Sequence, residues 1–350
     1  MTGDDMATGS AINPIAARKD AHLAIGLCPE LASSDATTGF EALRFEHCAL
    51  PEIDMDEIDL GTGFLGRRLK APFMISSITG GTDKAADVNT NLAIAAQQLG
   101  IAFAVGSQRI ALEGQGTGGL DLSLREFAPD IPILANIGGA QLAAGYGLTE
   151  AWRAVEMIDA DALIVHLNPL QEAVQPEGDR IWRGVLDGIA MLAKKLPCPV
   201  VVKEVGAGIC GSVACKLVGV GVQVIDVAGA GGTSWAAAEA GRIEDPSLRE
   251  TALLFADWGV PTARAILDVR LNCPAVQLIG SGGIRSGIDA GMAIRLGADI
   301  VGQAAAPGLC ATDSSEAVIA HFEKLIRELR LTCFLTGSKN LAELRRAALL

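Results

Sequence analysis

The chain has 350 residues, of which half are hydrophobic and 4 % aromatic, and it contains 41 glycines. Its 28 basic and 41 acidic side chains give a net charge of −13, which argues against nucleic-acid binding because that needs clustered Lys and Arg, but leaves room for a small phosphorylated ligand. No low-complexity or sustained heptad segment occurs, which excludes disorder or a coiled coil as a description of the whole chain.

Residues 1–13 are small and polar, and they lack the basic and then apolar pattern of a signal peptide. We expect a disordered extension there. No stretch of 18 uncharged apolar residues follows, so no membrane span is expected. The eight cysteines form no C-x-x-C pair and only four histidines are present, which argues against a zinc site and favours a reducing, cytoplasmic compartment.

Residues 14–350 are expected to form a single domain. Within it, residues 14–69 precede the repeating part of the sequence and are expected to cap it and to bring ligand-binding residues of their own. Residues 313–349 have the pattern of one or two C-terminal helices. A long insertion at residues 232–261 is expected to form a loop with helical pieces over the active face, because long loops in compact domains are often functional.

Short apolar runs alternate with amphipathic stretches over residues of about 70–312. The expected strands are 73–78, 102–105, 133–136, 162–166, 200–203, 223–227, 276–280 and 300–302. Helical patterns between them include 83–99, 180–196, 262–271 and 286–296. This alternation indicates βαβ units and a parallel sheet. Eight units favour the α/β class and a closed (β/α)8 TIM barrel, with a doubly wound open sheet as the alternative.

Polar residues concentrate at the same end of all eight predicted units. In a barrel the active site lies at the C-terminal ends of the strands. The polar runs that follow the strands are residues 76–82, 106–109, 136–139, 166–172, 203–206, 229–234, 280–285 and 302–305. This coincidence is the strongest physical signal in the sequence, and it argues against a scaffold that only binds a ligand.

The glycine-rich runs after the seventh and eighth strands indicate a phosphate site. Gly282-Gly283-Ile284-Arg285 opens a helix, where backbone N–H groups and a guanidinium can contact an anion. Barrels commonly bind phosphate at this place, although tight turns alone would also use the glycines. Lys203 ends an apolar strand and is expected to point into the barrel mouth, as a Schiff-base lysine or as a fixed cation beside an electron-rich cofactor.

The fourth strand leads into a group of polar side chains, His166, Asn168, Gln171 and Glu172. One carboxylate beside amides suits Mg²⁺, which takes one or two carboxylates and shares phosphate oxygens. The group therefore predicts a diphosphate or a similar ligand, with a polar loop and helix start as the plainer alternative. Near the N-terminus, Arg18-Lys19 and His22 suit an anion clamp, or equally a solvated surface.

Together these motifs resemble those of the type 2, FMN-dependent isopentenyl diphosphate isomerases, from about Arg18 to Pro307. The matching runs begin at Arg18, Thr79, Gly106, His166, Lys203, Gly229 and Gly282. The resemblance implies an FMN-binding barrel that interconverts isopentenyl and dimethylallyl diphosphate in isoprenoid biosynthesis. It also implies a cytosolic homo-oligomer, a tetramer or an octamer, with NADPH as the flavin reductant.

The resemblance also implies roles for individual residues. Catalysis would involve Gln171, His166 and Lys203, and Glu172 would hold Mg²⁺. Substrate would meet Arg18, Lys19, His22, Ser107, Gln108, Arg109, Asn168 and Gln171. FMN would be held by Ile78, Thr79, Gly80, Ser107, Asn136, Lys203, Thr233, Gly283, Ile284, Arg285, Ala304 and Ala305. The stretch 302–307 is one residue longer than the family pattern, which affects the expected phosphate contacts at Ala304 and Ala305.

The implied reaction moves a double bond, so a proton must be added to one carbon and removed from another. An unactivated alkene is a very weak base and needs a well-placed acid. Gln171 is an amide and Glu172 would be occupied by metal, which leaves the reduced flavin as the proposed acid and base. Lys203 beside the flavin would stabilise its anionic reduced form.

Two other enzyme classes are alternatives. A flavin barrel that oxidises 2-hydroxy acids needs a histidine base near strand seven, but no histidine lies between His166 and His321. A nucleotide dehydrogenase of the inosine-phosphate type has a cysteine nucleophile loop, which the run from Gly206 to Cys210 matches only faintly. Its position after strand five does not follow that pattern.

Overall fold

The computed structural model describes residues 32, 34–78, 83–114 and 116–350. Eight parallel strands close into a barrel in the order β10-β3-β4-β5-β6-β7-β8-β9. They are β3 (Phe73–Ile75), β4 (Ala102–Ala104), β5 (Ile133–Gly138), β6 (Ala162–His166), β7 (Val200–Lys203), β8 (Val224–Asp226), β9 (Gln277–Ser281) and β10 (Ile300–Gln303). Each corresponds to one expected strand and differs only at its ends. The barrel prediction is therefore confirmed, and the open sheet is wrong.

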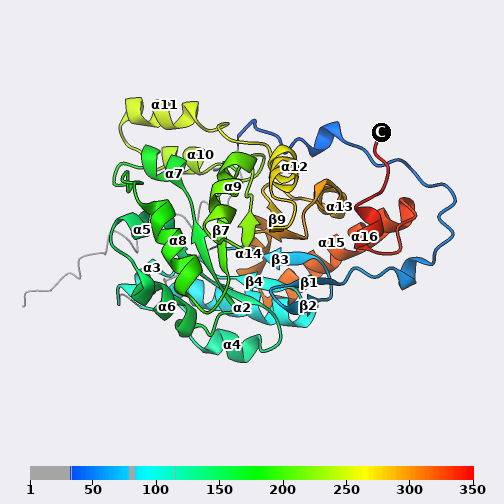
Figure 1. Cartoon of the computed structure of the whole chain (residues 1–350), viewed down its shortest axis with the longest axis horizontal. Helices are drawn as coiled ribbons and strands as arrows, with labels where there is room; N and C mark the ends of the chain where they lie inside the picture. Colours follow the sequence, from blue (N-terminus) through cyan, green and yellow to red (C-terminus); the bar gives the residue numbers. More distant parts are fainter. Residues whose placement is uncertain (1–31, 33, 79–82, 115) are drawn as a thin grey trace, which may run out of the picture.

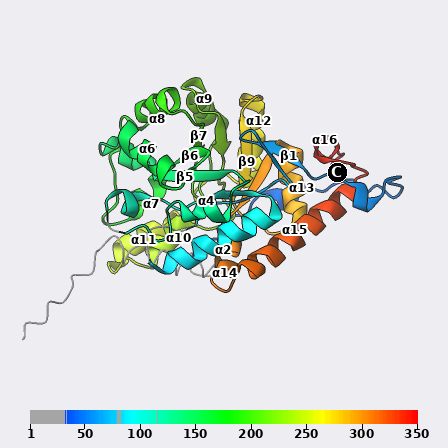
Figure 2. The ribbon, with the colours of Figure 1, turned by 90° about the horizontal axis from the view of Figure 1, so that it is seen from below.

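Helices surround the barrel, as Figure 2 shows for those around β5, β6 and β7. They are α2 (Asp83–Leu99), α3 (Arg109–Leu112), α4 (Ser123–Phe127), α5 (Gly139–Ala143), α6 (Leu148–Met157), α7 (Pro169–Val174), α8 (Val185–Lys195), α9 (Gly211–Gly219), α10 (Trp235–Ala240), α11 (Pro246–Leu254), α12 (Thr262–Asn272), α13 (Gly287–Leu296), α14 (Ala305–Ala311), α15 (Ser315–Leu335) and α16 (Leu341–Leu344). Helix α8 begins later than residue 180, because Gly184 precedes it with a left-handed φ of 89°.

Side chains of the strands alternate between the barrel interior and the surrounding helices. Leu134, Ile164, Val201, Val224 and Ile279 belong to the inner apolar cluster. Because the side-chain period of a strand is two residues, the residues two positions further along also point inward. These five residues are Asn136, His166, Lys203, Asp226 and Ser281, here called the inner polar layer. The sequence thus changes from apolar to polar at the carboxyl ends of five neighbouring strands.

A two-stranded hairpin, β1 (Thr62–Phe64) and β2 (Arg67–Leu69), closes the opposite end of the barrel. Phe64 and Leu69 are buried in the same inner cluster as the strand residues. Gln277 at the start of β9 donates to the carbonyl of Gly63 at 3.2 Å. The hairpin therefore covers the amino ends of the strands, away from the inner polar layer.

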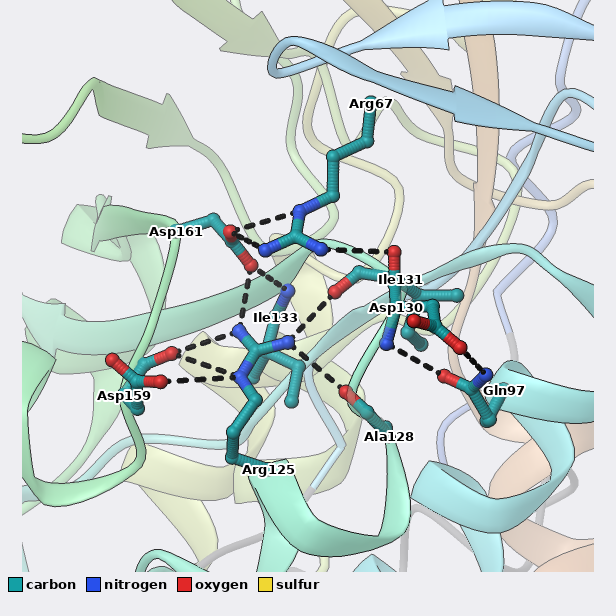
Figure 3. Close-up of polar contacts among 9 residues, drawn as sticks. All are labelled: Arg67, Gln97, Arg125, Ala128, Asp130, Ile131, Ile133, Asp159 and Asp161. Carbon is teal, nitrogen blue, oxygen red and sulfur yellow. Dashed lines mark hydrogen bonds and ion pairs between the residues drawn. The ribbon is translucent and has the colours of Figure 1, made fainter.

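An ion-pair network fastens this hairpin to the barrel (Figure 3). The guanidinium of Arg67 donates to Asp161 Oδ1 at 2.7 Å, and that of Arg125 donates to Asp161 Oδ2 at 2.7 Å. The backbone N–H of Ile133 also donates to Asp161 Oδ2, at 2.9 Å. Burial alone would raise the pKa of Asp161, but these contacts lower it below its usual value. One carboxylate therefore joins the hairpin, α4 and the start of β5.

The C-terminal helices lie beside the segment that precedes the barrel (Figure 1). Isolated bridges join Phe45 to Leu349 and Asp59 to Asn340. Two short 3-10 helices, η2 (Phe40–Ala42) and η3 (Met55–Glu57), belong to that segment. The insertion after β8 forms α10 and α11. In the described ranges, no helix has the length and apolar character needed to cross a membrane.

Candidate active site

A cavity of about 740 Å³ lies at the carboxyl ends of the barrel strands. Its volume is within the range of roughly 300–1,000 Å³ that small-molecule and cofactor sites occupy. The expected site residues that line it are Ile78, Ser107, Arg109, Asn136, His166, Asn168, Gln171, Glu172, Lys203, Thr233, Gly283, Ile284, Arg285, Ala304 and Ala305. Five others, Arg18, Lys19, His22, Thr79 and Gly80, lie outside the described residues. The fold thus gathers residues from all eight strand ends.

Gln108 is the one described residue of the expected site that does not line the cavity. Its side chain is fully buried and donates to the carbonyl of Ala154 at 2.8 Å. Its Oε1 accepts the backbone N–H of Asn136 at 2.8 Å. The residue therefore supports Asn136 from behind, and its place in the structure does not favour the expected substrate contact.

Hydrogen bonds connect the members of the inner polar layer to their surroundings. Lys203 Nζ donates to the carbonyl of Glu204 at 2.6 Å. The Oγ of Ser281 donates to Asp226 Oδ1 at 2.5 Å, whereas the buried Oδ2 of Asp226 has no hydrogen-bond partner. His166 Nδ1 and Asn136 Oδ1 are 2.8 Å apart. Burial raises the pKa of Asp226, and the charge of Lys203 only partly offsets that rise.

The carboxylate of Glu204 organises the loop after β7. Its Oε2 accepts the backbone N–H groups of Val205, Gly206, Ala207 and Gly208. Burial nevertheless raises the pKa of Glu204 above its usual value. Because the loop starts at Glu204, this contact fixes the backbone next to the carbonyl that binds Lys203. The sequence did not predict this role, because the partners of the Glu204 carboxylate are backbone N–H groups and not particular side chains.

Two glycine-rich loops pack backbone against backbone at one side of the cavity. Gly282 and Gly283 have φ values of 106° and 68°, which favour glycine. A Cβ at Gly282 would overlap the carbonyl oxygen of Gly229, and one at Gly283 would overlap that of Gly231. The guanidinium of Arg285 donates to the carbonyl of Gly231 at 2.9 Å. The glycines therefore allow the two loops to pack closely against each other beside the cavity, next to a cation.

The run after β6 forms a connected group of polar side chains. Asn168 Nδ2 donates to Gln171 Oε1 at 3.1 Å and to Glu172 Oε1 at 3.0 Å. Gln171 Nε2 donates to Glu239 Oε1 at 2.8 Å. Glu239 is fully buried on α10, and its Oε2 pairs with Arg242 at 2.7 Å. Glu239 was missed from sequence because it sits in an alanine-rich run of the insertion and has no motif of its own.

Arg109 stands beside this group and contacts two carboxylates. Its Nε donates to Glu113 at 2.9 Å and its Nη1 donates to Asp179 at 3.2 Å. Burial alone would lower the pKa of Arg109, but the two carboxylates raise it above its usual value. The backbone N–H of Asp179 donates to Glu172 Oε2 at 2.7 Å. Arg109, Asp179 and Glu172 therefore meet at the cavity wall, and Asp179 was not expected there.

Comparison with known proteins gives the family. The FMN-dependent dehydrogenase family matches residues 169–350. A lactate oxidase from Pediococcus acidilactici has a similar structure, with a TM-score of 0.63, 18% identity, and 96% of this chain and 93% of that chain covered. A flavocytochrome b2 aligns with a TM-score of 0.65 and 18% identity over 94% of this chain and 82% of that chain. These likenesses show a shared fold, and the chain is by family an FMN-dependent barrel protein.

Closer relatives narrow the assignment. The isopentenyl-diphosphate delta-isomerase of Stutzerimonas stutzeri (strain A1501) is 62% identical, over 96% of this chain and 97% of the relative. That of Cronobacter sakazakii is 55% identical, over 95% and 96%. That of a Nostoc species is 49% identical, over 94% of each. The chain belongs to the isopentenyl-diphosphate delta-isomerase family, which confirms the family that the sequence motifs indicated.

Proposed function

We propose that this barrel interconverts isopentenyl diphosphate and dimethylallyl diphosphate with bound FMN. The observation that carries the proposal is the arrangement of His166, Asn168, Gln171 and Glu172 in one cavity with Lys203. Family membership supplies the reaction, and the cavity supplies a place for both a flavin and a small substrate. A 2-hydroxy acid oxidase is disfavoured, because the inner polar layer holds no histidine on the strands after Lys203.

The residues present fit FMN. The two glycine-rich loops, with Arg285 and the loop at Ala304 and Ala305, suit the phosphate, because they line the cavity and bring backbone N–H groups and a cation that favour an anion there. The remainder of the FMN molecule would be held by Ile78, Ser107, Asn136, Lys203 and Thr233. Thr79 and Gly80, which are also expected to hold it, lie outside the described residues. When bound and reduced, FMN supplies a group that can give and regain a proton. Lys203 would place a positive charge beside it.

The diphosphate of the substrate would be bound by Arg109, Ser107, His166 and Asn168. The proposed diphosphate site also includes Arg18, Lys19 and His22, which lie outside the described residues. Glu172 would hold Mg²⁺ together with phosphate oxygens. No group of three or more His, Cys, Asp or Glu side chains within the described ranges could hold a metal by itself. A magnesium ion at Glu172 would therefore depend on the diphosphate for further ligands.

Gln171 would orient the hydrocarbon part of the substrate. Its amide oxygen accepts from Asn168 and its amide nitrogen donates to Glu239, so both ends of the amide are fixed. An amide at this place does not titrate, and its contribution is position. We further propose that NADPH reduces the bound FMN, that the enzyme is a cytoplasmic homo-oligomer, and that its family role lies in isoprenoid biosynthesis.

The test is an anaerobic isomerisation assay with isopentenyl diphosphate, Mg²⁺ and FMN, run with and without NADPH. We expect many turnovers of dimethylallyl diphosphate per NADPH, and product only when the flavin is reduced. A protein that binds reduced FMN and forms no product would contradict the proposal and point to a flavin oxidoreductase with another substrate.

Two variants separate the proposed roles. Lys203→Ala should weaken FMN binding or change the spectrum of the bound flavin, because it removes the cation of the inner polar layer. Glu172→Gln should raise the Mg²⁺ concentration needed for half-maximal rate while FMN binding stays unchanged. An unchanged Mg²⁺ dependence in Glu172→Gln would show that the metal is held elsewhere.

A further inference from the structure

The guanidinium of Arg109 is already held by carboxylates of this chain. Glu113 lies four residues further along the chain from Arg109, at 2.9 Å, and Asp179 comes from the loop between α7 and α8, at 3.2 Å. Asp179 lines the cavity, whereas Glu113 does not. A ligand that enters from the cavity therefore meets Arg109 on the side that Asp179 occupies.

Asp179 is held in this position by its own backbone. Its N–H donates to Glu172 at 2.7 Å, and its carbonyl accepts from the indole of Trp182 at 3.0 Å. The carboxylate can rotate about its side-chain bonds, but the main chain keeps it close to Arg109. The folded loop thus keeps Asp179 next to Arg109, and the same loop binds the carboxylate of Glu172.

The local charge is unfavourable for a diphosphate. The guanidinium of Arg109 contacts the carboxylates of Glu113 and Asp179, and a third carboxylate, that of Glu172, accepts from the backbone of Asp179. Opposite charges attract and like charges repel, and both effects are stronger near a protein surface than in bulk water. An incoming anion therefore either displaces Asp179 from Nη1 of Arg109 or binds another N–H of the guanidinium beside it, and in both cases the charge of Asp179 opposes binding unless a cation neutralises it.

We propose that Asp179 is the internal counter-ion of the diphosphate site, a residue that sets its affinity for the anion and its dependence on a divalent cation. The proposal rests on the proposed function, which places a diphosphate at Arg109. With the carboxylate of Asp179 beside Arg109, the site favours the anion only in company with a divalent cation. Asp179 contacts no reacting atom and acts through Arg109, so it is a positioning residue.

The test is isothermal titration of inorganic pyrophosphate into the FMN-loaded full chain, once with EDTA and once with Mg²⁺. Asp179→Asn keeps the shape and the backbone contacts but removes the charge. We expect its Kd in EDTA to fall roughly two- to fivefold, since partly exposed ion pairs have strengths of that order. With Mg²⁺ the difference from the unmodified protein should shrink.

Matched variants separate this effect from a general change in charge. Glu113→Gln removes the other carboxylate from the same guanidinium, on the side away from the cavity, and should change the Kd less than Asp179→Asn does. In the Arg109→Gln background, which should itself raise the Kd, Asp179→Asn should add nothing. Circular dichroism and FMN content confirm folding, and Asp179→Ala is a second variant with the same expected direction.

The outcomes distinguish this inference from the proposed function. If Arg109→Gln weakens pyrophosphate binding but Asp179→Asn binds it as the unmodified protein does, the counter-ion role is overturned and the diphosphate site stands. An equal gain in Glu113→Gln, or a gain that persists without Arg109, also overturns it. If Arg109→Gln leaves the Kd unchanged, pyrophosphate does not bind at Arg109 and the inference fails, while the isomerisation assay judges the activity separately.

Discussion

Lys203 and Asp226 stand directly opposite each other on β7 and β8, and both side chains point into the barrel. Two residues earlier, each strand has an inward-pointing valine, Val201 on β7 and Val224 on β8. Asp226 is fully buried, and its Oδ2 has no hydrogen-bond partner. The barrel therefore places a lysine and an aspartate on neighbouring strands, just above its apolar interior.

Asp226→Asn should change how stability depends on pH. Burial holds the pKa of Asp226 above its usual value of about 3.9, so the folded chain binds a proton that the unfolded chain releases. The free energy of unfolding therefore falls as pH rises from about 4 to the folded pKa, by at most about 1.4 kcal/mol per pH unit. Urea unfolding measured from about pH 4 upward should show that the variant lacks this fall.

Lys203→Met provides the control for this experiment. The lysine charge lowers the pKa of Asp226, so its removal should extend the fall in stability to higher pH. In the double variant that combines Asp226→Asn with Lys203→Met, the fall in the free energy of unfolding should be absent. A difference between the unmodified protein and Asp226→Asn that stays constant with pH would show that Asp226 does not titrate in this range.

The sequence predicted the barrel because its signals are local. Each strand is a short apolar run between turn residues, and the change from Val201 to Lys203 marks the end of one directly. Asp226 carries the same signal, a polar residue two positions after Val224, and could have been found by comparing neighbouring strands. It was overlooked because it stands alone, without a motif around it.

Contacts between distant segments could not be predicted in the same way. Glu239 meets Gln171 across 68 residues and Asp179 meets Arg109 across 70. Neither pair has a spacing that sequence periodicity could detect, because a loop and an insertion bring them together. The β1–β2 hairpin was missed for a related reason: its strands have three residues each, too few to show an alternating pattern.

Asp161→Asn should destabilise the protein by loosening the hairpin. The substitution removes a charge that accepts from Arg67, Arg125 and the backbone of Ile133 but keeps one acceptor oxygen, and a hydrogen bond to a charged group makes a net contribution of about 1.5–3 kcal/mol. We expect a loss of about 2–3 kcal/mol in urea unfolding at neutral pH. Because the folded pKa is lowered, this contribution exists above about pH 4 and disappears as pH falls through the folded value.

Asp159→Asn is the matched control. Asp159 lies next to the same arginine, with 3.6 Å between its Oδ2 and Arg125 Nε, but its side chain is 73% exposed. Exposed pairs contribute about 0–1 kcal/mol, so this variant should stay close to the unmodified protein. Equal destabilisation by the two substitutions would mean that the network in Figure 3 does not centre on Asp161.

Glu239→Gln should lower the turnover number more than it changes substrate affinity. Glu239 accepts from the amide nitrogen of Gln171 at 2.8 Å, and this contact determines which end of the amide faces the substrate. A glutamine at this place can present an N–H instead and turn the Gln171 amide round. Since small misplacements of a positioning group cost up to about 100-fold in rate, we expect a fall in kcat of about 10- to 100-fold.

Glu177→Gln is the matched control, because Glu177 contacts the same arginine as Glu239 but lies closer to the surface. Glu177 lies 3.6 Å from Arg242, which in turn pairs with Glu239, but its side chain is 55% exposed. It should keep kcat within about twofold, because exposed pairs add little. Equal losses in both variants would assign the effect to the charge of the insertion as a whole. A loss in Glu239→Gln alone would assign it to the orientation of Gln171.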